Sequence, residues 1–115
     1  MHEGAIAEAL LEQVRSFLPD QAVLREVHID VGRLEHLEEM VLQTFWAALT
    51  KGTGEEGSLL SVNVIALQVR CRGCGMEYEP EDPAIMLCPQ CGAARPEILQ
   101  GSGVVLRRME VEQPD

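Results

Sequence analysis

Residues 71–92 read CRGCGMEYEPEDPAIMLCPQCG and decide how this chain folds. The stretch holds all four cysteines of the protein, as two C-x-x-C pairs with thirteen residues between them. Each pair is followed by a glycine, which allows a tight turn with positive φ that can aim backbone N–H groups at the sulfur atoms. Two such pairs can place four thiolates around one tetrahedral ion at about 2.3 Å. The spacing therefore predicts a closed, structural metal site formed by Cys71, Cys74, Cys88 and Cys91.

Zinc is the metal that this donor set favours, because small ribbon domains commonly use four-thiolate zinc sites. A rubredoxin-like iron site has nearly the same spacing. Visible absorption distinguishes the two metals, because ferric thiolate sites are coloured and zinc sites are not. Disulfide pairing suits a secreted chain, and the first residues lack the basic start of a secretory signal. A thioredoxin-like redox motif needs only one of the two pairs. We therefore expect four-coordinate zinc with no open position for catalysis.

The sequence on both sides of the cysteines shows helical and strand patterns in turn. Apolar residues recur every three to four positions over 5–18 and over 34–50, as in amphipathic helices. Apolar runs that alternate or are rich in β-branched residues predict strands over 23–31, 59–69 and 104–111. The glycine-rich segment between the second helix and the second strand predicts a flexible loop. It matches G-x-G-x-x-G but leaves a helix and enters a strand, which is the reverse of a dinucleotide-binding loop.

These elements predict an α+β fold, a three-stranded mixed sheet covered by two helices, with an inserted four-cysteine zinc-ribbon subdomain. Strand, helix and strand in succession imply a parallel pair joined by a right-handed crossover. We expect residues 1–69 plus 101–115 to form an α/β domain and residues 70–100 to form the ribbon. The ribbon holds four of the six prolines and has too little apolar mass to fold without a metal.

The same periodicities assign core positions. With only four aromatic residues in the chain, we expect the core to be aliphatic. The apolar stripe of the first helix includes Phe17, and that of the second helix includes Met40 and Phe45. In the first strand, His28 and Asp30 lie on one face at i and i+2, and we expect that face to be solvated rather than to bind a metal.

The charge balance limits the kinds of partner. Nine Lys and Arg against nineteen Asp and Glu give a net charge of −10, which repels phosphate backbones and anionic lipid. No apolar run approaches the roughly 20 residues needed to cross a bilayer. We therefore expect a cytoplasmic protein without nucleic-acid or membrane partners. The sequence has no nucleophile elbow, P-loop or isolated carboxylate dyad, so we also expect no catalytic activity of its own.

The first three residues carry the remaining chemistry. If Met1 keeps a free amine, that amine, the backbone nitrogen of His2 and the His2 imidazole can form fused chelate rings around one ion. Nickel(II) and copper(II) favour such nitrogen-rich, square-planar geometry. Glu3 can add its backbone nitrogen or its carboxylate. Terminal residues are usually frayed and a single histidine is usually just exposed, so these residues alone leave both interpretations open.

Taken together, four features resemble the HypA/HybF family of hydrogenase nickel-incorporation proteins. They are Met1-His2-Glu3 opening an amphipathic helix, the strand end Ile29-Asp30-Val31-Gly32, the paired cysteine motifs, and a strand following Ile98-Leu99-Gln100-Gly101. The resemblance implies that Met1, His2 and Glu3 hold nickel as transferred cargo and that the four cysteines hold structural zinc. Gly4-Ala5 departs from the family, where a bulkier residue and a small polar one are more usual.

The resemblance also implies partners. Members act as metallochaperones that, with a HypB-like GTPase, insert nickel into the large subunit of nickel–iron hydrogenase, and some also serve urease. We expect a monomer or a weak homodimer. The alternative is a zinc-ribbon adaptor that binds only proteins and has an inert N-terminus. Nickel titration of the authentic N-terminus separates the two.

Overall fold

The computed structural model describes residues 2–113 of the chain, which form two compact units. The first, called the helical unit, comprises Met1–Asp30, Leu37–Asn63 and Val105–Asp115. The second, called the cysteine unit, comprises Val31–His36 and Val64–Val104. Whether residues 70–100 fold as an independent ribbon stays a prediction.

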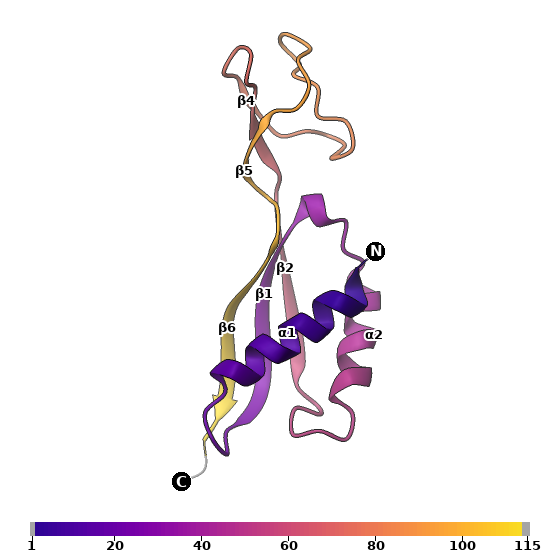
Figure 1. The fold of residues 1–115 in the computed structure, drawn as a ribbon, viewed down its shortest axis with the longest axis vertical. Coiled ribbons are helices and arrows are strands. Elements are labelled where there is room, and N and C mark those ends of the chain that lie inside the picture. Colours follow the sequence, from indigo (N-terminus) through magenta and orange to yellow (C-terminus); the bar gives the residue numbers. More distant parts are fainter. Residues whose placement is uncertain (1, 114–115) are drawn as a thin grey trace. The chain divides into compact units, whose positions relative to one another are not determined.

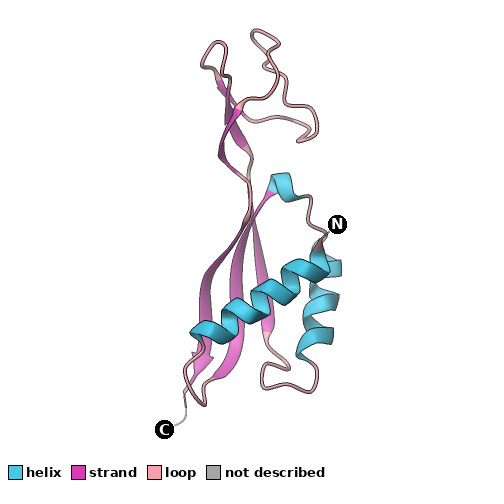
Figure 2. Cartoon of the chain, in the orientation of Figure 1, coloured by secondary structure: helices cyan, strands magenta, loops and turns pink. Residues whose placement is uncertain are grey.

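Two helices and three strands account for the helical unit and its sheet. The helices are α1 (Glu3–Phe17) and α2 (Glu39–Thr50), and the strands are β1 (Val23–Gly32), β2 (Leu59–Ile65) and β6 (Val104–Glu112). The strand order is β2-β1-β6, so the first strand is central. Strands β1 and β2 run in the same direction and β6 runs opposite to them (Figure 1). The predicted α+β class, with a mixed sheet and two helices, is confirmed (Figure 2).

The core of the helical unit is aliphatic except at one position. Its buried apolar side chains are Ala7, Leu10, Leu11, Val14, Leu24, Val27, Ile29, Leu42, Trp46 and Leu60. Burial of the Trp46 indole leaves no unpaired donor, since its N–H donates to the Ser58 hydroxyl at 3.0 Å. Phe17, by contrast, is exposed, so its predicted place in the core is wrong.

The second helix is shorter than the predicted 34–50. Residues Arg33–Glu35 form a separate 3-10 turn, η1, and His36 follows it with a left-handed backbone at φ 51°. A left-handed residue cannot continue an α-helix, so α2 begins only at Glu39.

The buried face of α2 also differs from the prediction. The buried residues of α2 are Leu42, Trp46 and Thr50, one turn apart from each other. Met40 is 84 % exposed and Phe45 is 43 % exposed. The ring of Phe45 lies over Gly4 in α1, where an added Cβ would be 3.1 Å from Phe45 Cε1. Phe45 thus packs between the helices rather than into the sheet.

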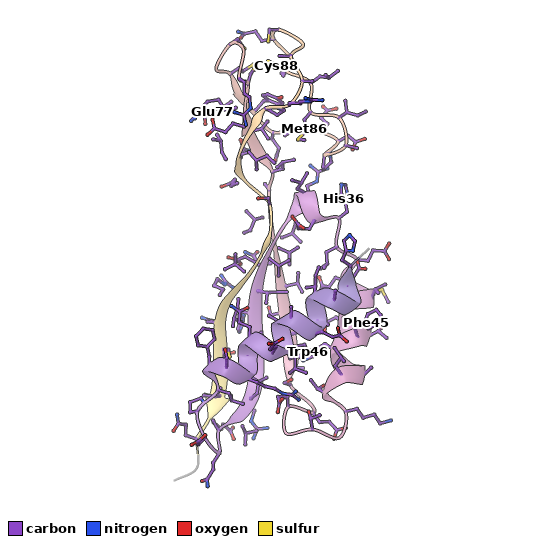
Figure 3. The ribbon with its side chains drawn as sticks, viewed as in Figure 1. His36, Phe45, Trp46, Glu77, Met86 and Cys88 are labelled. Carbon is purple, nitrogen blue, oxygen red and sulfur yellow. The ribbon has the colours of Figure 1, made fainter. Side chains whose placement is uncertain are left out.

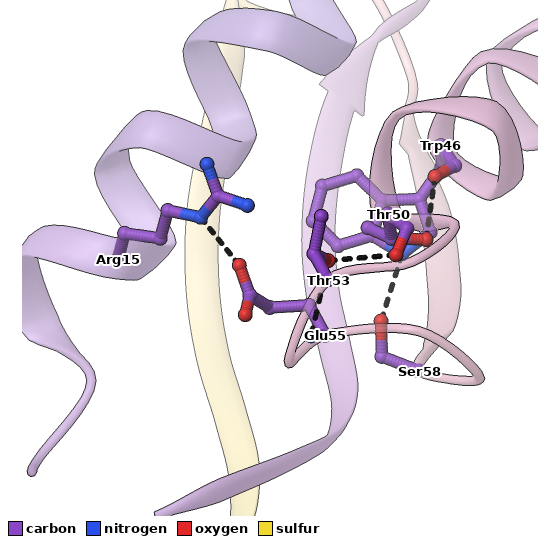
Figure 4. Close-up of polar contacts among 6 residues, drawn as sticks. All are labelled: Arg15, Trp46, Thr50, Thr53, Glu55 and Ser58. Atoms are coloured by element: carbon purple, nitrogen blue, oxygen red, sulfur yellow. Dashed lines mark hydrogen bonds and ion pairs between the residues drawn. The ribbon is translucent and has the colours of Figure 1, made fainter. Parts of the chain in front are cut away.

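The loop between α2 and β2 is confirmed, and it is held by side chains (Figure 4). The buried carboxylate of Glu55 accepts from the Arg15 guanidinium in α1. The Thr53 hydroxyl donates to the Thr50 carbonyl at 2.6 Å and accepts the Glu55 N–H at 3.2 Å. These bonds hold the loop against α1 and the end of α2.

The cysteine unit contains a second sheet. Its strands are β3 (Gln68–Arg70), β4 (Glu77–Tyr78) and β5 (Glu97–Gln100), in the order β4-β3-β5, and all pairs are antiparallel. The single strand predicted over 59–69 is therefore divided: β2 ends at Ile65, and β3 belongs to the other sheet.

Two glycines explain why the strand is divided there. Gly101 has φ +95°, and a Cβ on it would lie 2.5 Å from Leu67 Cα and 2.6 Å from the Ala66 carbonyl oxygen. A Cβ on Gly32 would lie 2.2 Å from the carbonyl carbon of Gly101. Three chain segments thus touch backbone to backbone, which only glycine permits.

No helix within residues 2–113 is long and apolar enough to span a bilayer.

Candidate metal centres

The sulfur atoms of the four cysteines lie close together in the cysteine unit. One of these residues, Cys88, is labelled in Figure 3. All four lie within 4.8 Å of one another, with Cys71 and Cys91 at 3.5 Å and Cys74 and Cys88 at 3.6 Å. A tetrahedral ion with bonds of about 2.3 Å spaces its sulfurs about 3.8 Å apart, whereas a disulfide brings them to about 2.05 Å. All four cysteines are free. The arrangement fits one four-coordinate ion.

Each cysteine pair has the same local geometry. The first sulfur of each pair accepts two backbone N–H groups: Gly73 and Cys74 donate to Cys71 at 3.3 and 3.4 Å, and Gln90 and Cys91 donate to Cys88 at 3.4 and 3.5 Å. The glycine after each pair has positive φ, 79° at Gly75 and 77° at Gly92, as predicted. Such N–H groups stabilise thiolates, which are the form that binds metal.

The pKa values of Cys71 and Cys91 shift in opposite directions. The backbone N–H of Cys74, together with that of Gly73, lowers the pKa of Cys71 to about 6. The Ala93 N–H also acts to lower the pKa of Cys91, but the neighbouring thiols, Cys71 first, raise it to about 11. Four thiolates this close repel one another, so they cannot all ionise alone. A divalent cation removes that obstacle, and the donor set fits zinc.

At the other candidate site, Met1 lies outside the described residues, and the structure describes His2 and Glu3. His2 is exposed and precedes α1, and its carbonyl accepts the Ile6 N–H at 2.9 Å, which starts the helix. The imidazole is therefore open to an ion from solvent.

Glu3 differs from His2 because its side chain is buried. One carboxylate oxygen accepts the backbone N–H of Glu38 at 2.9 Å. This hydrogen bond is the main reason that the pKa of Glu3 falls to about 2. The carboxylate of this predicted ligand thus has a structural role, which sequence periodicity did not reveal.

A third group of polar side chains lies on β1 and β6. His28, expected to be solvated, is only 8 % exposed, and its Nε2 lies 3.0 Å from Glu110 and 3.6 Å from Glu26. The expectation was wrong for His28, which is buried and contacts the side chain of Glu110 on the neighbouring strand β6. Asp30, its expected neighbour, pairs instead with Arg107 at 3.6 Å.

A mixed sheet covered by helices, with a four-cysteine ribbon inserted in it, defines a small metal-binding protein of the zinc-ribbon-like class. The sequence model of the family described as "Hydrogenase/urease nickel incorporation, metallochaperone, hypA" matches residues 1–111. The chain therefore belongs to the HypA family, and the resemblance noted in the sequence is confirmed.

Individual relatives agree with this assignment. The chain is 33 % identical over 115 residues to the hydrogenase maturation factor HypA of Synechococcus sp., covering 97 % of this chain and 87 % of that protein. It is 29 % identical over 114 residues to the hydrogenase maturation factor HypA of Aquifex aeolicus, covering 97 % and 98 %. Its fold is similar to the solution structure of the Ni metallochaperone HypA from Helicobacter pylori, with a TM-score of 0.65 at 17 % identity, covering 99 % and 100 %.

Proposed function

We propose that this chain is a nickel metallochaperone that binds Ni(II) at its N-terminus through Met1, His2 and Glu3 and carries structural zinc on its four cysteines. The observation that carries the nickel site is the exposed His2 imidazole directly before α1, in a chain whose family handles nickel. An exposed terminal chelate of this kind suits a cargo that must be released again. Nickel is therefore cargo rather than a resident cofactor.

The start of a helix is a suitable place for amide nitrogen ligands. An α-helix does not use its first N–H groups in its own hydrogen-bond ladder. The backbone nitrogens of His2 and Glu3 lie at this position, so a metal that displaces their protons breaks no hydrogen bond of the α1 backbone ladder. Because the Glu3 carboxylate bonds to Glu38, we favour the backbone nitrogen of Glu3 as its donor atom.

The zinc has a different role from the nickel. Bound to Cys71, Cys74, Cys88 and Cys91, it would cross-link the 70–100 segment and supply structural stability without an open coordination position. We infer that this segment is the ribbon domain and that residues 1–69 plus 101–115 form the nickel-binding domain. Few apolar side chains are buried between the cysteine pairs, which supports a fold that depends on metal.

The partners follow from the named relatives, which are hydrogenase maturation factors. We infer that nickel goes to the large subunit of nickel–iron hydrogenase, with urease as a second target class, and that a HypB-like GTPase assists. The exposed acidic residues Glu8 and Glu12 on α1 give this helix a face for transient, charge-dependent docking.

Calorimetric nickel titration of the zinc-loaded protein tests the N-terminal site. We expect the native chain to bind nickel at this site, and both a chain extended by Gly-Ser before Met1 and the His2→Ala variant to lose the binding at this site. The extension keeps every side chain and alters only the amine. His36→Ala is the matched control, because His36 is also exposed but lies far along the sequence. Equal affinity in all four proteins would contradict the site and leave the adaptor function.

A further inference from the structure

A histidine and two carboxylates meet on the face of the sheet that lies opposite the core. His28 stands between Val27 and Ile29 in β1, and both of these are fully buried in the core. Because side chains alternate along a strand, His28 points to the other face. There, one donor atom from each of Glu26, His28 and Glu110 lies within 4.8 Å of the others.

The carboxylates on either side of this group each pair with an arginine, whereas the group itself has more negative than positive charge. Arg25 pairs with Glu112 at 2.6 Å, and Arg107 pairs with Asp30 at 3.6 Å. Within residues 2–113, in contrast, His28 is the only basic side chain within 4.0 Å of Glu26 or Glu110, and the more distant Arg108 acts only on Glu110 through its charge. Two carboxylates facing a neutral imidazole carry a charge of −2. Even a protonated imidazole leaves a net charge of −1.

A single ring nitrogen faces both carboxylates. Nε2 of His28 lies 3.0 Å from Glu110 Oε2 and 3.6 Å from Glu26 Oε2. This nitrogen holds either one proton or one lone pair. One proton on this nitrogen makes one good hydrogen bond and cannot bond both carboxylates equally well. A cation that accepts the lone pair can contact all three groups at once.

We propose that Glu26, His28 and Glu110 form a further binding site for a divalent transition-metal ion of the zinc and nickel class. One imidazole with two carboxylates suits such ions, whereas magnesium and calcium prefer oxygen ligands alone. The site is open on one side, because the Glu110 side chain is 51 % exposed while His28 is nearly buried. An ion can therefore enter from solvent and complete its coordination with water.

This site is distinct from the other two in composition and position. It contains no thiolate, so it binds metal more weakly than the four cysteines, and it uses no terminal amine. Its residues lie in the helical unit, whereas the four cysteines lie in the cysteine unit. Ion binding at this site does not require nickel transfer at the N-terminus.

Zinc titration of the full-length protein, with the four-cysteine site already filled, tests the proposal at pH 8. The first readout is the imidazole NMR signal of His28, with that of the exposed His36 as the reference. The second is the number of zinc ions per chain. We expect the His28 signal to shift and saturate, and the wild type to bind one zinc more than His28→Gln or Glu110→Gln, with affinity at this site reduced at least about tenfold in the variants.

Glu112→Gln is the matched control, because Glu112 lies on the same strand and pairs with Arg25 instead of His28. We expect it to keep the additional zinc. Should His28→Gln fail to fold, Glu110→Gln decides, since Glu110 is exposed. An unchanged His28 signal, or equal zinc content in the wild type and Glu110→Gln, would overturn the site and leave an ordinary ion pair.

Discussion

The carboxylate of Glu3 accepts the backbone N–H of Glu38 at 2.9 Å, so a single side chain joins the start of α1 to the residue before α2. The two residues are 35 positions apart in sequence. Glu38 N–H precedes the second helix, where backbone donors need partners from outside the helix. The segment proposed to carry nickel is thereby anchored to the second helix by its own third residue.

This contact predicts a pH dependence. The pKa of Glu3 falls from an ordinary value of 4.5 to about 2, mainly because of the Glu38 hydrogen bond. A lowered pKa in the folded state means that the stabilisation is present above pH 4.5 and is lost as the pH falls toward 2. We expect the free energy of unfolding of the wild type to exceed that of Glu3→Gln at pH 7, and the difference to shrink over this interval. Urea denaturation of both proteins at several pH values measures this difference.

Two controls make this test specific to Glu3. Glu8→Gln changes an exposed carboxylate of the same helix and should give a difference that is small at every pH. The NMR signal of the Glu38 amide should titrate with a midpoint well below 4.5. A constant stability difference between wild type and Glu3→Gln would contradict the assigned role.

The contact of Gly4 with Phe45 predicts non-additive mutations. Alanine is a better helix former than glycine by roughly 0.5–1 kcal/mol, but its Cβ at position 4 would lie 3.1 Å from the Phe45 ring. We expect Gly4→Ala to stabilise the Phe45→Leu background by the full helix gain and the wild type by less. A double-mutant cycle with thermal unfolding measures the coupling. Additive effects would show that the ring moves away without cost.

Local sequence patterns were sufficient to predict most elements of the helical unit and the four-cysteine site. The 5–18 and 23–31 patterns correspond to α1 and β1 within a few residues, although the burial of Phe17 and His28 differs from the prediction. The C-x-x-C-Gly motif fixes its own geometry through backbone N–H groups within the motif, so the convergence of four sulfurs was predictable.

Contacts between distant segments explain what the patterns did not predict. The predicted 59–69 strand is divided because Gly101, far along the chain, lies against Leu67. Phe45 lies over Gly4 instead of entering the core, and this contact depends on where α1 runs. His28 contacts Glu110, which is 82 positions later in the sequence. The alternation within one strand predicts which face His28 occupies, but it does not predict this partner.

The close contact at Gly101 predicts a large effect of one methyl group. A Cβ there would lie 2.5 Å from Leu67 Cα, and φ +95° disfavours any other residue. We expect Gly101→Ala to destabilise the protein by at least about 3 kcal/mol in thermal unfolding. Gly103→Ala is the matched control, since Gly103 has φ +82° with open space around it, and it should cost only about 1–2 kcal/mol. Equal losses would show that backbone conformation alone matters.

Removing one ligand of the four-cysteine site should unfold the ribbon and leave the sheet. Cys88 is buried, and its sulfur accepts two backbone N–H groups, so Cys88→Ser weakens both the metal site and the local turn. Because β2-β1-β6 buries its own core, we expect loss of amide protection within 70–100 only. Hydrogen exchange with zinc content measured in parallel tests this.

Tyr78→Phe is the control, because it removes only the 2.6 Å hydrogen bond to the Met86 carbonyl. This variant should lose about 1 kcal/mol of stability and keep the zinc. Protection lost equally along the whole chain would instead mean that the ribbon and the sheet fold as one.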